Sequence, residues 1–253
     1  MFKYKIYDHN VISDVSFDFL EESEFREPDI TIKESHYINL SNNSEKYLAN
    51  LNYKHGIIRN AFFECIVSNG KSIEYSSIKS KELDEFKINM LHMPFAFLLF
   101  QKNVLPLHSM AFKYKNKAIL IAGPSTYGKS TIGTELSKIF DILSEDIVGI
   151  SFENNKCYAI PSFPIILSDS YKDQMDLVKY SKKTLTRDRK ILKISNFNSK
   201  RIPIKNIFYL DWGENLEIYE PSDEYIFRQI VQNSFKPMPT DKCIKSNKRY
   251  FHL

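Results

Sequence analysis

Residues 123–130 read Gly-Pro-Ser-Thr-Tyr-Gly-Lys-Ser, and they carry the clearest chemistry in the chain. The run fits the pattern G-x-x-x-x-G-K-[ST], a loop whose backbone N–H groups bind phosphate oxygens. Lys129 is expected to reach the β- and γ-phosphates of a nucleotide, and the Ser130 hydroxyl to ligate Mg²⁺. The predicted nucleotide-binding residues are Gly123, Pro124, Ser125, Thr126, Tyr127, Gly128, Lys129, Ser130 and Thr131.

Glycine is scarce in this chain, which makes its positions informative. Only 7 of the 253 residues are glycine, and three of these (Gly123, Gly128 and Gly133) lie close together. Gly123 and Gly128 hold fixed positions of the motif, where a side chain would block the approach of the backbone to phosphate. Gly133 lies outside the motif, and we expect it to allow close packing of a helix on a strand.

Two adjacent acids, Glu145 and Asp146, follow the next apolar strand. One acid can hold Mg²⁺ while the other accepts the proton of an attacking hydroxyl, although one of them could instead be a surface residue. His108 precedes the strand that leads into the loop. A hairpin around residues 115–117 would bring His108 to the same strand ends, where it could orient a carboxylate; the alternative is a structural histidine.

The elements around these residues indicate an α/β arrangement. Strands are predicted over 118–122, 142–143, 147–152, 157–160 and 207–210, and helices over 129–140 and about 222–235. The first helix has Ile132, Leu136 and Ile139 on one face. An apolar strand, a loop, a helix and then a strand that ends in acids is typical of an α/β fold. The order of the strands in the sheet cannot be read from the sequence.

The first part of the chain has a different pattern. Short strands are predicted over residues 4–7, 30–33, 57–67 and 72–75. Apolar residues then recur at helical spacing over 81–101, where Pro94 should bend or break the helix. We therefore expect two domains: a β-rich domain with its connecting helix over 1–95, and a catalytic domain over 96–253.

The composition excludes several classes of protein. A hydrophobic fraction of 43% is ample for a packed core. Cys65, Cys157 and Cys243 show no paired spacing, so we expect neither a disulfide framework nor a zinc site. No apolar run approaches the roughly 20 residues of a membrane span, and the N-terminus lacks the pattern of a signal peptide. We expect a cytoplasmic protein with no membrane partner.

Charge is distributed unevenly along the chain. Residues 96–253 carry 24 basic and 16 acidic side chains, whereas residues 1–95 carry 11 and 15. A basic domain indicates an anionic ligand, although a solvated lysine-rich surface is the alternative.

Arg187 and Arg189 could contact phosphate or substrate, or could form an exposed basic loop. No aromatic-basic recognition motif accompanies the charge, so a nucleic-acid-binding ATPase ranks last among our hypotheses.

Four blocks of the sequence, in this order, resemble a known family. They are Leu107-His108-Ser109, residues 121–131, Leu143-Ser-Glu-Asp-Ile147 and Ala159-Ile-Pro-Ser-Phe-Pro164. The chain resembles the HPr kinase/phosphorylase-like P-loop kinases. Within them it is most similar to the short members found with peptide-modification clusters, including the lasso-peptide precursor serine kinases. The resemblance covers residues 95–235 well and residues 1–95 poorly.

The resemblance implies a P-loop kinase domain of the HPr kinase (PEP carboxykinase-like) type with a small β-rich N-terminal domain. It also implies transfer of the γ-phosphoryl group of ATP, with Mg²⁺, to a Ser or Thr hydroxyl of a small protein or precursor peptide. Carried over by motif, it makes Glu145 the general base and His108 the partner of that base. Asp146 and Ser130 become the metal ligands. HPr kinases are oligomeric, so the resemblance also implies a homo-oligomer, although the sequence does not give the number of subunits.

One position departs from the family pattern. The family usually has Asp-Asp where this chain has Glu145-Asp146, and the longer side chain moves its carboxylate by about 1 Å, a displacement that can cost ~10²-fold in rate. The base and metal roles could therefore be exchanged between the two acids. Alternatively, the protein could be a nucleotide-binding regulatory or assembly module with little or no phosphotransfer. Whether the donor is ATP, GTP or diphosphate is also open.

Overall fold

The computed structural model describes residues 1–35, 49–51, 54–124, 127–168, 190–194 and 196–235. The described residues form two compact units, one up to Val104 and the other from Leu105 to Phe235. We expected the division near residue 95. It falls later because the helix that ends at Gln101 packs against strands of the first unit.

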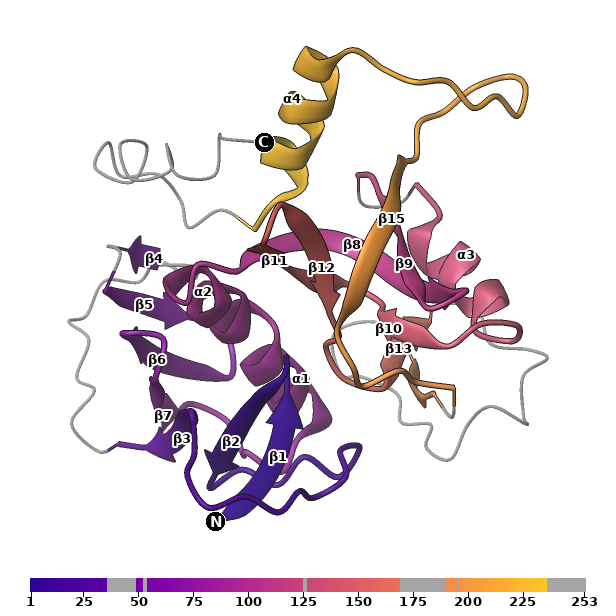
Figure 1. Ribbon diagram of the computed structural model, residues 1–253. Coiled ribbons are helices and arrows are strands. Elements are labelled where there is room, and N and C mark those ends of the chain that lie inside the picture. The colour runs from indigo at the N-terminus through magenta and orange to yellow at the C-terminus, as the bar shows by residue number, and fades with distance from the viewer. Residues whose placement is uncertain (36–48, 52–53, 125–126, 169–189, 195, 236–253) are drawn as a thin grey trace. The chain divides into compact units, whose positions relative to one another are not determined.

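The N-terminal unit is built on one mixed sheet. Its strands are β1 (Phe2–Ile6), β2 (His9–Ser13), β3 (Ile30–Glu34), β4 (Ala49–Leu51), β5 (His55–Arg59), β6 (Phe63–Ser68) and β7 (Ser72–Ser77). They lie in the order β1-β2-β3-β7-β6-β5-β4 (Figure 1). The β-rich character that we predicted for this part of the chain is therefore what the structure has.

The prediction of a single strand over residues 57–67 is wrong, because β5 and β6 are separated by a tight turn. Asn60 makes this turn: its Oδ1 accepts hydrogen bonds from the backbone N–H groups of Phe62 at 2.8 Å and Phe63 at 3.0 Å. An Asn side chain often replaces a backbone partner in this way. Phe62 and Phe63 are both buried, so the apolar pattern runs through the turn and conceals it.

Two short helices follow, α1 (Asp84–Leu91) and α2 (Met93–Gln101). The predicted break at Pro94 is confirmed, since this proline lies in the first turn of α2 and His92 between the helices is not helical, with φ −90° and ψ −96°. Phe86 of α1 packs edge-on against Phe63 and Tyr75 of the sheet, with ring centroids 5.1 and 5.5 Å apart. These aromatic contacts anchor α1 on the sheet.

In its described residues, the C-terminal unit is mixed α/β, with sheets and few helices. Its strands are β8 (Leu105–Tyr114), β9 (Lys117–Ala122), β10 (Ile142–Ser144), β11 (Ile147–Glu153), β12 (Lys156–Ile160), β13 (Ile165–Ser168), β14 (Lys190–Lys193) and β15 (Ile202–Tyr209). Its helices are α3 (Lys129–Leu136) and α4 (Asp223–Asn233). Among the described residues, no helix is both long enough and apolar enough to cross a membrane.

The pairings of the larger sheet close on themselves. They run from β8 through β11, β12 and β15 to β9, and β9 pairs with β8 again. β15 runs parallel to β9, whereas the other pairings of this ring are antiparallel. The hairpin predicted around residues 115–117 is confirmed: Lys115 and Asn116 form its turn, with φ of 47° and 61°. Its two strands carry the candidate site.

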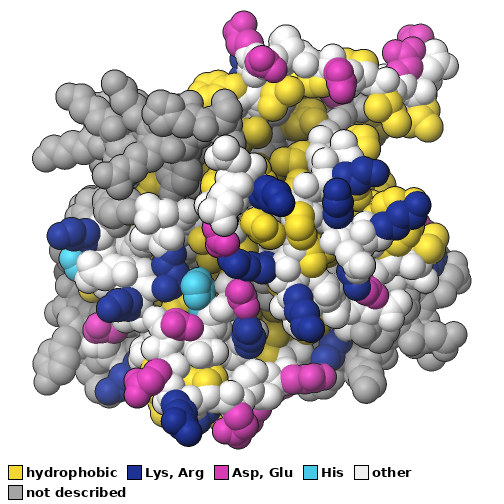
Figure 2. Space-filling view, in the orientation of Figure 1, with side chains coloured by type: hydrophobic (Ala, Val, Ile, Leu, Met, Phe, Trp, Pro, Cys, Tyr) yellow, Lys and Arg dark blue, Asp and Glu magenta, His cyan; other side chains and the backbone are white. Residues whose placement is uncertain are grey.

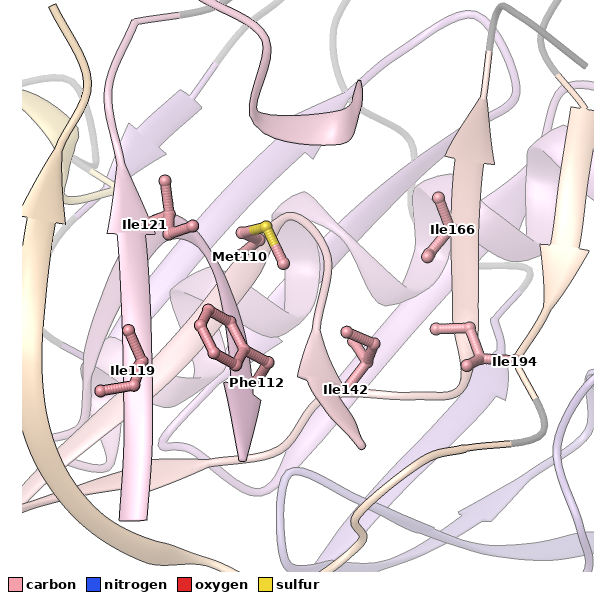
Figure 3. Packing of buried hydrophobic residues seen from close by; sticks show 7 residues of the cluster. All are labelled: Met110, Phe112, Ile119, Ile121, Ile142, Ile166 and Ile194. Atoms are coloured by element: carbon pink, nitrogen blue, oxygen red, sulfur yellow. The ribbon is translucent and has the colours of Figure 1, made fainter. Parts of the chain in front are cut away.

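Helix α3 lies against β8, over the core of this unit. The buried side chains of that core are Met110, Phe112, Ile119, Ile121, Ile142, Ile166 and Ile194 (Figure 3). The prediction that α3 continues to residue 140 with Ile139 on its buried face is wrong, because α3 ends at Leu136 and Ile139 is 72% exposed. Phe140 packs against the core instead, with its ring centroid 5.2 Å from that of Phe112.

Candidate functional site

Strand β8 aligns the site, because three neighbouring strands pair with consecutive parts of it. The aligned pairs are His108 with Ile147 of β11, Ser109 with Ala122 of β9, and Ala111 with Ser144 of β10. The candidate phosphate loop, residues 123–130, follows β9 directly, and the two acids lie between β10 and β11. The register therefore brings the loop, both acids and His108 to one edge of the sheet.

The loop needs glycine at two positions for different reasons. Gly123 has φ +151°, and a Cβ there would lie 3.1 Å from the carbonyl oxygen of Leu210. Gly128 has φ +88°, and a Cβ added there would have no described atom within 4 Å, so its requirement is conformational alone. Gly128 immediately precedes α3, whose N-terminal N–H groups face the loop with positive potential, an arrangement suited to an anion.

Lys129 is buried at the base of the loop. Its Nζ donates hydrogen bonds to the carbonyl oxygens of Gly123 at 2.7 Å and Pro124 at 2.9 Å. Burial lowers the pKa of Lys129, and the neighbouring carboxylates of Asp146 and Glu145 oppose that shift by stabilising the ammonium. A cation with so little access to water interacts strongly with any phosphate that the loop takes up.

The two acids have different partners. Ser130 Oγ donates a hydrogen bond of 2.8 Å to Glu145 Oε1. His108 Nδ1 lies 2.9 Å from Asp146 Oδ1 and 3.2 Å from the backbone oxygen of Asp146. The backbone N–H of Ser109 donates to that same oxygen at 3.0 Å, which fixes Asp146 on β8. The resemblance pairs His108 with the first acid, whereas these contacts pair it with the second.

The residues present suit a magnesium ion. Within the described ranges, no group of three or more His, Cys, Asp or Glu side chains could hold a metal by itself. Mg²⁺ at a phosphate site does not require such a group, since it takes one or two protein carboxylates and completes its shell with phosphate and water oxygens. The hydroxyl of Ser130 beside the carboxylate of Glu145 supplies oxygen ligands of this kind.

Several predicted residues lie outside the described part of the chain. These are Ser125, Thr126, Arg187 and Arg189, together with the C-terminal residues 236–253. Their predicted contacts with phosphate or substrate stay predictions. Tyr127 and Thr131 are described and lie on either side of the Gly128-Lys129-Ser130 turn into α3.

Sequence reasoning missed two residues beside the loop, Leu210 and Trp212. The backbone N–H of Leu210 donates to the carbonyl of Ala122 at 2.9 Å, and Leu210 limits the space at Gly123. The ring of Trp212 packs near that of Tyr127, with centroids 5.5 Å apart. The apolar pattern predicts a strand near 207–210, but only its parallel pairing with β9 puts the residues that follow it beside the loop.

Comparison with protein-family models gave no match, and no curated protein matches in sequence. Among solved structures, the chain is similar to the HPr(Ser) kinase/phosphatase of Coxiella burnetii. The similarity has 13% identity and a TM-score of 0.24, over 58% of this chain and 99% of that one. A TM-score of this size does not establish a shared fold, so the function has to be argued from the site.

Proposed function

We propose that this protein transfers the γ-phosphoryl group of ATP to a serine or threonine hydroxyl of a small protein or precursor peptide. The observation that carries the proposal is the meeting of three groups at one sheet edge. They are the buried Lys129 of the loop, the Ser130–Glu145 pair and the His108–Asp146 pair. Each group matches one requirement of phosphoryl transfer: phosphate binding, metal binding and proton removal.

We assign metal binding to Ser130 and Glu145. A loop hydroxyl beside a carboxylate from the following strand is the usual protein contribution to a nucleotide-bound Mg²⁺. The extra methylene of Glu145 lets its carboxylate reach the Ser130 hydroxyl at 2.8 Å. When bound there, Mg²⁺ neutralises charge on the β- and γ-phosphates. This assignment exchanges the roles that the resemblance gives to the two acids.

Asp146 is then the general base. His108 Nδ1–H donates to Asp146 Oδ1 and holds the carboxylate in place, and the other carboxylate oxygen takes the proton of the acceptor hydroxyl. The hydroxyl oxygen forms a bond to the γ-phosphorus while the bond to the β–γ bridging oxygen breaks. ADP leaves with that electron pair, and Lys129 balances the negative charge on the phosphates.

The proposal is tested by incubating the protein with γ-labelled ATP, Mg²⁺ and a panel of serine-containing peptides. We expect label on a serine hydroxyl. The variant Lys129→Met should lose on the order of 10²- to 10³-fold in rate, since it removes one charge-stabilising donor. Lys138→Met is the matched control, because Lys138 is exposed and pairs at the surface with Glu135.

Tight ATP binding without transfer to any hydroxyl would overturn the proposal. It would favour instead a regulatory or assembly module that changes the affinity for a partner when ATP binds. Equal transfer rates for Lys129→Met and Lys138→Met would also contradict it, since the loop would then have no part in the reaction.

A further inference from the structure

The segment of residues 211–220, which we call the arm, connects β15 to α4 (Figure 1). All of its residues are exposed. Four of its side chains are large and hydrophobic. Their exposed fractions are 74% for Trp212, 98% for Leu216, 81% for Ile218 and 66% for Tyr219. A concentration of exposed hydrophobic side chains on one segment is a feature of interaction surfaces.

The arm is acidic as well as hydrophobic. Its acids are Asp211, Glu214, Glu217 and Glu220, and it contains no Lys, Arg or His. Figure 2 shows acidic and hydrophobic side chains together at the upper right, over the segment that leaves β15. A segment that complements this surface has apolar side chains interspersed with Lys or Arg. Nucleic acid does not fit, because its phosphates would be repelled.

The arm begins beside the candidate phosphate loop. β15 runs parallel to β9, and Tyr209 at its end pairs with Ala122, the residue before the loop. The arm therefore leaves the sheet at the edge where the loop begins, and the Tyr127–Trp212 ring contact joins the two segments. The loop and the arm thus follow the carboxyl ends of two strands that run side by side in the same direction. A chain bound on the arm is thus placed to present a hydroxyl to Asp146.

We propose that the arm binds the phosphoacceptor through a segment in which basic and apolar residues alternate. The inference rests on the proposed function, because it names the substrate class of the same site. The exposed side chains of the arm take up the apolar residues, and its glutamates pair with the basic ones. The position beside the loop favours a substrate over a second copy of this chain, which would cover the approach to the site.

Trp212 is the single tryptophan of the chain, so its fluorescence reports peptide binding at the arm in the absence of ATP. Serine peptides of three kinds are titrated against the protein: a Lys/Leu pattern, a Glu/Leu pattern and a Ser/Gly pattern. We expect the Lys/Leu peptide alone to give a saturable blue shift of the Trp212 emission, weakened by salt.

The charge requirement is tested with two triple variants of identical spacing. Glu214→Gln, Glu217→Gln and Glu220→Gln together should weaken binding of the Lys/Leu peptide by about tenfold, since each exposed pair contributes a modest amount. Glu21→Gln, Glu24→Gln and Glu27→Gln form the control, because these acids lie in the N-terminal unit. Equal affinities of the two triple variants would overturn the inference.

Two further results separate the possible failures. A blue shift that grows with protein concentration in the absence of peptide, with dimers in sedimentation, would overturn the inference in favour of a second copy. Saturable binding of the Lys/Leu peptide without phosphoryl transfer would support the arm as a peptide site and contradict the kinase. Transfer to all three peptides at equal rates would support the kinase and contradict the arm.

Discussion

The side chain of Glu145 is one methylene longer than that of Asp146, and the two carboxylates contact different residues. The longer side chain reaches Ser130 of the loop, and the shorter one stays against His108 on β8. The acid that accepts the hydrogen bond of the loop hydroxyl is therefore the first of the two. The sequence identified both acids and His108 as candidates, but the pairing depends on side-chain reach, which spacing alone does not give.

Alanine substitutions test the roles of the glycines in and beside the loop. Gly128→Ala should abolish nucleotide binding through its φ of +88°. Gly123→Ala should weaken it, because its φ of +151° strains an alanine and the added Cβ would lie 3.1 Å from the Leu210 oxygen. Gly133→Ala should keep binding, because its Cβ would meet the flexible thioether of Met110, at 3.3 Å, and alanine favours the helix. Calorimetric titration with ATP and Mg²⁺ measures this directly. Equal losses in Gly128→Ala and Gly133→Ala would contradict the explanation.

At the scale of elements, the parts with local signals could be predicted from the sequence. The β8–β9 hairpin, the strand–loop–helix around the motif and the break at Pro94 all follow from turn residues, apolar spacing and proline geometry. The parallel pairing of β15 with β9 could not be predicted, because an apolar strand does not specify its neighbour. The turn at Asn60 was hidden because buried phenylalanines continue the apolar run.

His9 on strand β2 should make the stability of the folded chain depend on pH. Burial, with a smaller contribution from Lys102, lowers the pKa of His9 from 6.5 to about 4. Its Nε2 is buried without a hydrogen-bond partner among the described residues. In the folded chain His9 is therefore neutral above about pH 4, whereas the unfolded chain binds the proton near pH 6.5 as pH falls. The free energy of unfolding should decrease between about pH 6.5 and pH 4, by up to about 3 kcal/mol.

Urea unfolding of the full chain at several pH values measures this decrease. The variant His9→Phe removes the titrating group and should flatten the pH dependence in that window. His55→Phe is the control, because it removes a histidine from the exposed end of β5 and leaves the buried position of His9 intact. The same slope in wild type and His9→Phe would show that another group is responsible.

At the scale of the whole molecule, the chain separates a β-rich unit from a unit that holds the candidate site. The sequence predicted two parts from the change in apolar pattern near residue 81. It placed the boundary too early, because helical spacing does not say which sheet a helix packs against. The C-terminal half is basic as a whole, so the acidic arm stands out against it. This contrast agrees with the two ligands that we propose, an anionic nucleotide at the loop and a cationic peptide at the arm.

The roles that we propose for the two acids are tested most directly by single-turnover transfer rates of Asp146→Asn and Glu145→Gln over a range of Mg²⁺ concentrations. We predict that Asp146→Asn loses ~10²- to 10⁴-fold in rate at every Mg²⁺ concentration while it keeps ATP affinity, as expected for loss of a general base. Glu145→Gln should instead need at least about tenfold more Mg²⁺ and then recover most of its rate. The reverse pattern, with Glu145→Gln beyond rescue and Asp146→Asn restored by Mg²⁺, would contradict the account.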